Sequence, residues 1–191
     1  KEKEQFLQYK NRLKQSFAVI HQLHESEGLT NYTANIFDIY ETNHTVYIVS
    51  SYVEGDSLAE SKPGSLRDVI TIGISTAKCI ERIHKAGYLY LDIKPENVIV
   101  NGKGQAKVAD FGLAALMDAT GSGTTGGGTI GYMPLEQMRQ EPLDVRTDEW
   151  ALASLTYEML TGSNPFFADD LDAAEEAIEE AGGIDLQLLG L

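Results

Sequence analysis

The chain has 191 residues, of which 42% are hydrophobic and 23% charged, which suits one globular domain with a sizeable core or two small lobes. Its formal net charge of −14 argues against nucleic acid or an anionic membrane surface as the main partner. The charge is compatible with a basic polypeptide substrate, although acidity is also a general device for solubility. No apolar stretch is long enough to span a membrane.

The first half of the chain predicts a helix, a β-hairpin and a second helix. Residues 1–27 place apolar side chains three or four apart, which is the helical period. Residues 34–40 and 45–53 are apolar and β-branched on either side of the turn-like tetrad 41–44, as is typical of a hairpin. Residues 65–86 return to the helical period.

This second helix carries its own boundary signals. Ser65 fits the N-cap position with Asp68 three residues later, and Gly87 fits the position just beyond the C-terminal end. Cys79 lies in the apolar pattern of the helix and is the only cysteine, so the chain can form no internal disulfide. We expect it to be a small buried core residue.

The second half predicts two short strands, 98–100 and 106–109, joined by a tight turn at 101–104. Residues 113–135 are rich in Gly and Thr without periodicity and predict a long mobile loop, of the kind that is usually either functional or disordered. A further helix is predicted over 147–160. The last segment predicts a surface helix with the acidic residues Asp169, Asp170, Asp172, Glu175, Glu176, Glu179 and Glu180.

Polar residues flank the predicted hairpin of the second half. Asp92 and Asn97 precede its first strand, and Asp110 directly follows its second strand, so the three side chains should converge at one end. Transfer of a phosphoryl group needs a carboxylate for the attacking hydroxyl, a cation for the γ-phosphate and oxygen ligands for magnesium. The cluster, with Lys94 nearby, has these groups.

The run Tyr90–Asn97 resembles the catalytic loop of serine/threonine protein kinases, and Asp110-Phe111-Gly112 resembles their metal-binding motif. A lysine two residues after the aspartate is the serine/threonine pattern. The resemblance implies ATP and Mg²⁺ as cofactors and a protein substrate with a Ser or Thr acceptor. The implied roles are catalysis for Asp92, Lys94 and Asn97, and magnesium binding for Asn97 and Asp110.

Three further segments carry the same resemblance. Residues 128–136 resemble the end of the kinase activation segment, where Thr129 would touch the catalytic loop. Asp148 matches the family aspartate that holds this loop by its backbone. Residues 47–55 resemble the hinge that binds adenine, and the implied cofactor-binding residues there are Ser50 as gatekeeper, with Ser51 and Val53 through their backbone.

The chain also departs from the family pattern. Tyr90-Leu91 stands where the family has His-Arg, and Leu91 cannot bind a phosphorylated residue because it lacks the guanidinium. We therefore hypothesise that phosphorylation of the loop is not a strict on-switch. Glu136 keeps the family glutamate, but no arginine follows Arg146, so Glu136 must be exposed or bonded otherwise.

Two nucleotide-binding features of the family have no match in the chain. The run 121–126 fits Gly-x-Gly-x-x-Gly, but no strand precedes it, so it predicts a flexible loop and not a phosphate cradle. Residues 5–24 contain no glutamate for the lysine that pairs with the ATP phosphates; the matching position falls near Gln15 or Ser16.

Together these features predict an α+β, bilobal protein-kinase-like fold, incomplete at both ends. Residues 1–53 would form a partial small lobe of one helix and a hairpin, and residues 54–191 a mainly helical large lobe. The implied protein is a cytoplasmic signalling kinase of the bacterial eukaryotic-like type, with no nucleic-acid partner and no membrane contact from this segment. The alternatives are a pseudokinase or scaffolding module and, as the nearest competitor, a small-molecule phosphotransferase.

Overall fold

A computed structural model of the chain describes most of its middle and part of its first helix. The eight described positions between residues 6 and 21 are all helical, which confirms the predicted first helix at these positions. The position matched to the family glutamate, near residues 15 and 16, lies outside the described residues. The described positions are 6, 7, 10, 11, 14, 17, 18, 21, 32–42, 45–110, 114–117, 123 and 127–182.

The first hairpin is longer at its tip and shorter at its base than predicted. Strands β1 (Ile36–Thr42) and β2 (Thr45–Ser50) pair antiparallel up to Thr42 opposite Thr45, because β-branched residues continue the ladder. The predicted tetrad turn was therefore too long. Strand β2 ends at Ser50 and not at residue 53, since its partner strand begins only at Ile36.

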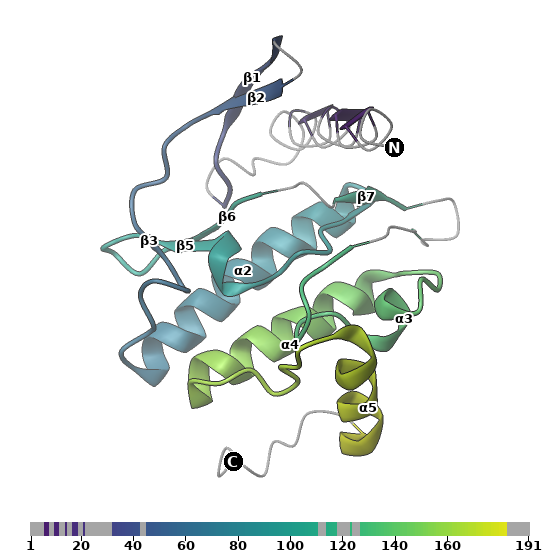
Figure 1. The fold of residues 1–191 in the computed structure, drawn as a ribbon. Coiled ribbons are helices and arrows are strands. Elements are labelled where there is room, and N and C mark those ends of the chain that lie inside the picture. Colours follow the sequence, from purple (N-terminus) through teal and green to yellow (C-terminus); the bar gives the residue numbers. More distant parts are fainter. Residues whose placement is uncertain are drawn as a thin grey trace.

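The first helix is tied to this hairpin by charge. Lys10 and Lys14 both form ion pairs with Glu41 on β1, the second with a separation of 3.3 Å between Lys14 Nζ and Glu41 Oε2. These pairs hold the pKa of the Glu41 carboxyl below its usual value, with the hydrogen bond from Lys10 as the largest cause. In Figure 1 the β1–β2 hairpin lies above α2, and the base of the hairpin reaches the core, where Ile36 packs against the main apolar cluster.

Helix α2 (Leu66–Lys85) begins and ends where its sequence predicts. Ser65 caps it by accepting a hydrogen bond from the Asp68 N–H at 3.2 Å, and Gly87 follows its end with a positive φ of 87°. Cys79 is fully buried as predicted, and burial raises the pKa of its thiol to about 12. The buried face of α2 consists of Val69, Ile72, Thr76, Cys79, Ile80 and Ile83.

Three short strands lie against α2. Strand β5 (Val98–Val100) is central and pairs antiparallel with β3 (Asp56–Ser57) and with β6 (Ala106–Val108). A second small sheet pairs β4 (Tyr88–Leu89) with β7 (Ala115–Leu116). Strands β3, β4 and β7 were not predicted, because strands of two residues carry no periodicity. The composition of residues 113–135 had suggested a wholly irregular segment, but this segment contains strand β7.

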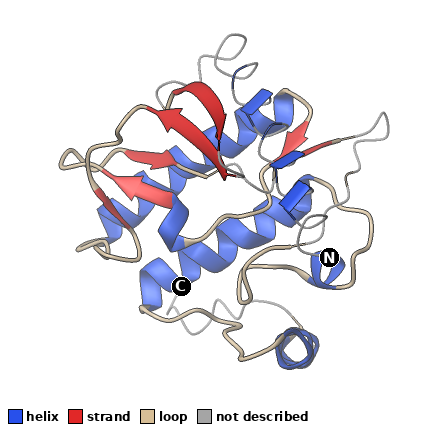
Figure 2. Ribbon diagram, turned by 45° about the horizontal axis from the view of Figure 1, so that its top comes forward, coloured by secondary structure: helices blue, strands red, loops and turns tan. Residues whose placement is uncertain are grey.

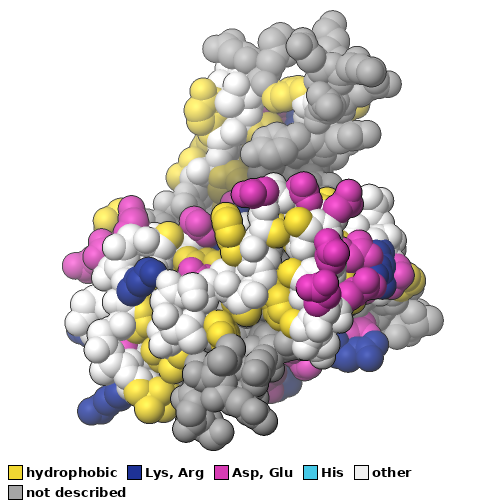
Figure 3. All heavy atoms as spheres, turned by 60° about the horizontal axis from the view of Figure 1, so that its bottom comes forward, with side chains coloured by type: hydrophobic (Ala, Val, Ile, Leu, Met, Phe, Trp, Pro, Cys, Tyr) yellow, Lys and Arg dark blue, Asp and Glu magenta, His cyan; other side chains and the backbone are white. Residues whose placement is uncertain are grey.

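The remaining helices build the far side of the domain. Helix α3 (Leu135–Met138) is short, and helix α4 (Val145–Thr161) begins two residues earlier than predicted because Asp144 caps it, accepting from the Arg146 N–H at 2.9 Å. Helix α5 (Leu171–Ala181) exposes its acidic face as predicted and packs through Ala174 and Ile178. Arg139 pairs with Glu175 and Glu179 of α5; Figure 3 shows the acidic side chains gathered on this face of the molecule.

Helix α2 is the centre of the packing. One apolar cluster joins it to the β5–β6 hairpin on one side and to α4 on the other (Figures 1 and 2). The α+β class is therefore confirmed, with small sheets beside a helical part. Among the helices that can be described, we find none with both the length and the apolar character needed to cross a bilayer.

Candidate active site

The end of the β5–β6 hairpin brings the predicted polar residues together. Asn97 closes a short 3-10 turn (Pro95–Asn97) before β5, and Ala109 and Asp110 directly follow β6. Because Val98 pairs with Val108, the Ala109 N–H donates to the Asn97 carbonyl at 2.8 Å. Asp110 comes next, exposed and with a φ of 55°, whereas Phe111 and Gly112 lie outside the described residues.

Asp92 is the centre of a hydrogen-bonded network. Its Oδ2 accepts from Asn97 Nδ2 at 2.8 Å and pairs with Lys94 Nζ at 3.0 Å. Its Oδ1 accepts from Thr129 Oγ1 at 3.0 Å, while Thr129 Oγ1 accepts from Lys94 Nζ at 3.1 Å. Asp92 is only 8% exposed. The structure therefore brings together the three predicted catalytic residues, Asp92, Lys94 and Asn97, and confirms that Thr129 touches the loop.

The backbone before Asp92 is held by Asp148. This fully buried carboxylate accepts from the Tyr90 N–H at 2.9 Å and from the Leu91 N–H at 2.7 Å, which confirms its predicted role. Leu91 has a φ of 67°, a left-handed conformation that costs energy for a branched residue and that these bonds stabilise. His84, at the end of α2, bonds Asp148 Oδ2 through Nε2 at 2.7 Å.

Tyr90 packs beneath the network. Its ring is fully buried, and its hydroxyl donates to the Ala109 carbonyl, one residue before Asp110. Burial, followed by the negative charges of Asp92, Asp110 and Asp148, raises the pKa of Tyr90 well above its usual value. A neutral phenol is therefore a permanent donor that links the catalytic loop to the strand leading to Asp110.

At the end of the activation segment, Glu136 is bonded by a threonine. Glu136 accepts from Thr147 Oγ1 at 3.1 Å, so of the two expected alternatives, exposed or bonded otherwise, the structure shows the second. The Tyr132 hydroxyl donates to Glu158, and burial and this bond raise the pKa of Tyr132. Of the run 121–126, only Gly123 is described, and it pairs with Leu143 through two backbone bonds of 2.7 and 2.8 Å.

The predicted hinge residues lie at the end of β2 and in the linker that follows. The Ser51 N–H donates to the Asn35 carbonyl at 2.7 Å, and Ser51 Oγ accepts from the Asn35 N–H at 2.9 Å, which fixes the linker to the start of β1. Within the described part of the chain, no hydrogen bond or ion pair joins Ser50, Ser51 or Val53 to the Asp92 network.

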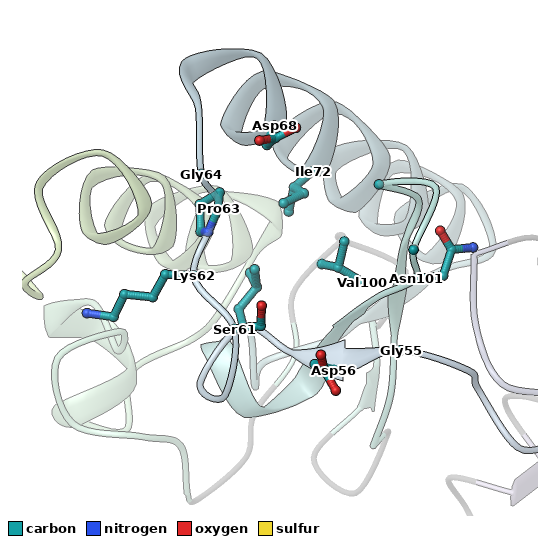
Figure 4. Close-up of a pocket in the computed structure, with 13 residues that line it drawn as sticks. Gly55, Asp56, Ser61, Lys62, Pro63, Gly64, Asp68, Ile72, Val100 and Asn101 are labelled. Atoms are coloured by element: carbon teal, nitrogen blue, oxygen red, sulfur yellow. The ribbon is translucent and has the colours of Figure 1, made fainter.

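Two cavities lie away from the network. One of about 270 Å³ sits at the turn end of the β5–β6 hairpin, with Asp56, Lys62 and Asp68 in its wall (Figure 4). The Lys62 side chain points away from this cavity, because Lys62 Nζ donates to the Gly162 carbonyl at 3.0 Å. The other, of about 430 Å³, runs between α2 and α4 behind His84 and Asp148. Neither is lined by a predicted catalytic residue.

The described residues offer magnesium two oxygen donors. In this part of the chain, no group of three or more His, Cys, Asp and Glu gathers as a ready metal site. Asn97 Nδ2 donates to the side chain and the carbonyl of Asp92, and neither of these bonds uses the amide oxygen of Asn97. Magnesium keeps several waters and binds through one or two protein oxygens plus phosphates, so Asn97 and Asp110 fit it.

Comparison with known proteins shows which family the chain belongs to. The sequence model of the protein kinase domain matches residues 2–186, so the chain belongs to the protein kinase domain family. Several similar relatives are bacterial proteins named as serine/threonine kinases. A probable serine/threonine-protein kinase of Clostridium perfringens is 38% identical over 141 residues, 71% of this chain and 21% of the relative.

Two more relatives agree. A probable serine/threonine-protein kinase of Corynebacterium efficiens is 38% identical over 128 residues, 63% of this chain and 19% of its own length. The serine/threonine-protein kinase PknB of Mycolicibacterium smegmatis is 34% identical over 131 residues, 64% of this chain and 21% of its own length. The chain thus spans about a fifth of the length of these relatives.

Two residues of the site had no signal in the sequence. His84 shares the last turn of α2 with the basic residues Arg82 and Lys85, and its partner Asp148 is 64 residues away. Gln137 is buried and donates to the Leu91 carbonyl of the catalytic loop, and no pattern in the sequence singled it out. Only the tertiary structure shows that Gln137 is bonded to the catalytic loop and that His84 is bonded to Asp148, the residue that holds this loop.

Proposed function

We propose that the chain is the catalytic domain of a serine/threonine protein kinase that transfers the γ-phosphate of ATP to a Ser or Thr hydroxyl of a protein. The observation that carries the proposal is the buried network in which Asp92 contacts Lys94, Asn97 and Thr129. The names of the bacterial relatives support the same activity.

The side chains of the network have distinct roles in this proposal. Asp92 orients the attacking hydroxyl and takes its proton as the oxygen bonds to the γ-phosphorus and ADP leaves. Lys94, already 3.0 Å from Asp92, balances the charge that develops on the transferred group. Asn97 Oδ1 and the Asp110 carboxylate hold Mg²⁺, which supplies charge neutralisation on the phosphates.

The nucleotide base is assigned to the linker after β2. Ser50 is the gatekeeper, and the backbone of Ser51 and Val53 bonds adenine; for Ser51 this is the carbonyl, because its N–H is engaged by Asn35. Residues 1–53 form the small lobe and residues 54–191 the large lobe. The protein acts in the cytoplasm on a protein substrate, and the net charge of −14 favours a basic one.

The test is phosphorylation of a generic basic protein by the full-length protein with Mg-ATP, beside its Asp92→Asn variant. This variant keeps the size of the side chain but removes the base, so we expect the rate to fall about 10²–10⁴-fold. Asp56→Asn is the matched control, because Asp56 is an exposed residue of β3 outside the network. Its rate should stay within about twofold of the wild type.

Three outcomes would contradict the proposal. Equal rates for Asp92→Asn and the wild type would remove Asp92 as the base. An inactive wild type that also fails to bind Mg-ATP would favour the pseudokinase or scaffolding alternative, and phosphorylation of a small molecule but of no protein would favour the small-molecule phosphotransferase.

A further inference from the structure

Gln137 bonds the catalytic loop and the activation segment at the same time. It lies on α3 and is 4% exposed. Its Nε2 donates to the Leu91 carbonyl at 3.2 Å and to the Gly127 carbonyl at 2.8 Å. These acceptors lie 46 and 10 residues away in the chain. One amide group, with two N–H donors, thus satisfies two carbonyls on two different segments.

The bond to Leu91 acts on the peptide that carries Asp92. The Leu91 N–H is held by Asp148 at 2.7 Å, and the Leu91 carbonyl belongs to the peptide unit that leads into Asp92. Leu91 is in the left-handed region at a φ of 67°. With Asp148 on one side and Gln137 on the other, both polar groups of this strained residue are fixed, and so is the direction in which the Asp92 side chain leaves the loop.

The bond to Gly127 depends on glycine in the activation segment. Gly127 and Gly128 have φ values of 128° and 146°, which other residues rarely adopt. A Cβ at Gly128 would lie 2.7 Å from Gln137 Nε2 and 2.4 Å from Met133 Sδ. The segment therefore approaches Gln137 more closely than a side chain at Gly128 would permit, and Thr129, which bonds Asp92, follows directly.

We infer that Gln137 is a positioning residue that holds the activation segment against the catalytic loop in the active arrangement. The link consists of one neutral amide and two backbone carbonyls, so neither a phosphate nor an ionised side chain is part of it. The contact between the two segments is therefore present without phosphorylation of the segment. This inference rests on the proposed kinase function for its kinetic consequence, but the contact itself can be tested separately.

The experiment compares Gln137→Leu and Gln137→Glu in the full-length protein, with Gln105→Leu as the matched control at the exposed turn of the β5–β6 hairpin. Gln137→Leu removes both donors at similar size. We expect kcat to fall about 10-fold or more, because two carbonyls lose their donor. The KM for ATP should stay within about twofold, since the linker after β2 is not touched. For the control Gln105→Leu, both kcat and the KM for ATP should match those of the wild type.

The glutamate variant supplies a readout that a merely structural role would not move. An ionised carboxylate would place oxygens that can only accept opposite two carbonyl oxygens, which is unfavourable. The protonated carboxyl has one O–H donor and can again bond one of the two carbonyls. The activity of Gln137→Glu relative to the wild type should therefore rise as the pH is lowered through the pKa of the new carboxyl, which burial raises. Gln137→Leu should show no such rise.

Hydrogen exchange separates this inference from the proposed function. In Gln137→Leu the amides of residues 128–132 and 90–92 should exchange faster, while those of α2 stay unchanged. Unchanged exchange in both segments would overturn the inference even if the wild type is an active kinase. Faster exchange in a protein without kinase activity would keep the contact and reject the proposed function. Loss of nearly all wild-type activity on phosphatase treatment would also overturn the inference.

Discussion

The two ends of the β5–β6 hairpin are built in different ways. At the turn end, Asn101 Oδ1 accepts from the N–H groups of Lys103 at 2.9 Å and Gln105 at 3.0 Å, and the Gly104 N–H donates to the Asn101 carbonyl at 2.8 Å. Every one of these partners lies within four residues of Asn101. The turn end is thus fixed by its own sequence.

At the other end, the partners come from distant segments. Asp92, beside Asn97, is bonded to Thr129, which is 37 residues away, and its loop is held by Asp148, which is 58 residues from Tyr90. Asp92, Asn97 and Asp148 are buried, so each must find a partner that only the folded domain can supply. The site end therefore forms only with the whole fold, and damage there should cost both stability and activity.

The largest expected effect is that of Asp148→Ala. This change leaves the buried N–H groups of Tyr90 and Leu91 without an acceptor and removes the partner of His84. Each orphaned buried group costs about 1–3 kcal/mol, so we expect a loss of about 3–5 kcal/mol in the free energy of unfolding, measured by urea denaturation.

The control for this variant is Asp144→Ala in the same helix. Asp144 caps α4 from an accessible position, and loss of a cap typically costs about 1 kcal/mol. If both variants lost the same stability, the tie between Asp148 and the loop would contribute nothing beyond the helix itself, and the contrast between the two ends of the hairpin would fail.

A smaller effect is expected for Thr129→Val, and it should fall on activity. Valine keeps the shape of threonine but cannot donate to the Asp92 carboxylate or accept from Lys94. A hydrogen bond to a charged group contributes about 1.5–3 kcal/mol, so kcat of the full-length protein should fall about 10–100-fold in steady-state kinetics. Thr129→Ser keeps the hydroxyl and should retain most of the activity; a serine variant as slow as valine would assign the effect to packing of the methyl group.

Local features of the fold were predictable because their signals lie within a few residues. Ser65 with Asp68, and Gly87, marked the ends of α2, and Asn101–Gly104 marked a turn, through side-chain and backbone chemistry at fixed short spacings. The two-residue strands were not predictable, because a pair such as Asp56–Ser57 becomes a strand only through its partner β5.

The residues of the site also fall into those that sequence reasoning found and those that only tertiary packing shows. A hairpin with polar residues at one end predicted that Asp92 and Asn97 meet and that Asp110 follows the neighbouring strand, and resemblance supplied Thr129 and Asp148 as partners. Nothing local distinguished His84 or Gln137 from exposed polar residues of a helix. Their contacts depend on how α2, α3 and α4 pack, and helical periodicity does not encode which polar residue meets a distant carbonyl or carboxylate.

The smallest effect is expected at the turn end, for Asn101→Ala. The change removes the acceptor for the N–H groups of Lys103 and Gln105, which can turn to water because the turn is largely exposed. The free energy of unfolding should therefore fall by only about 1 kcal/mol. Because the strands between the two ends keep their ladder, kcat and the KM for ATP should stay within about twofold of the wild type. A fall in kcat as large as that of Thr129→Val would show that the hairpin transmits strain from its turn to Asn97, and the two ends could no longer be treated as independent.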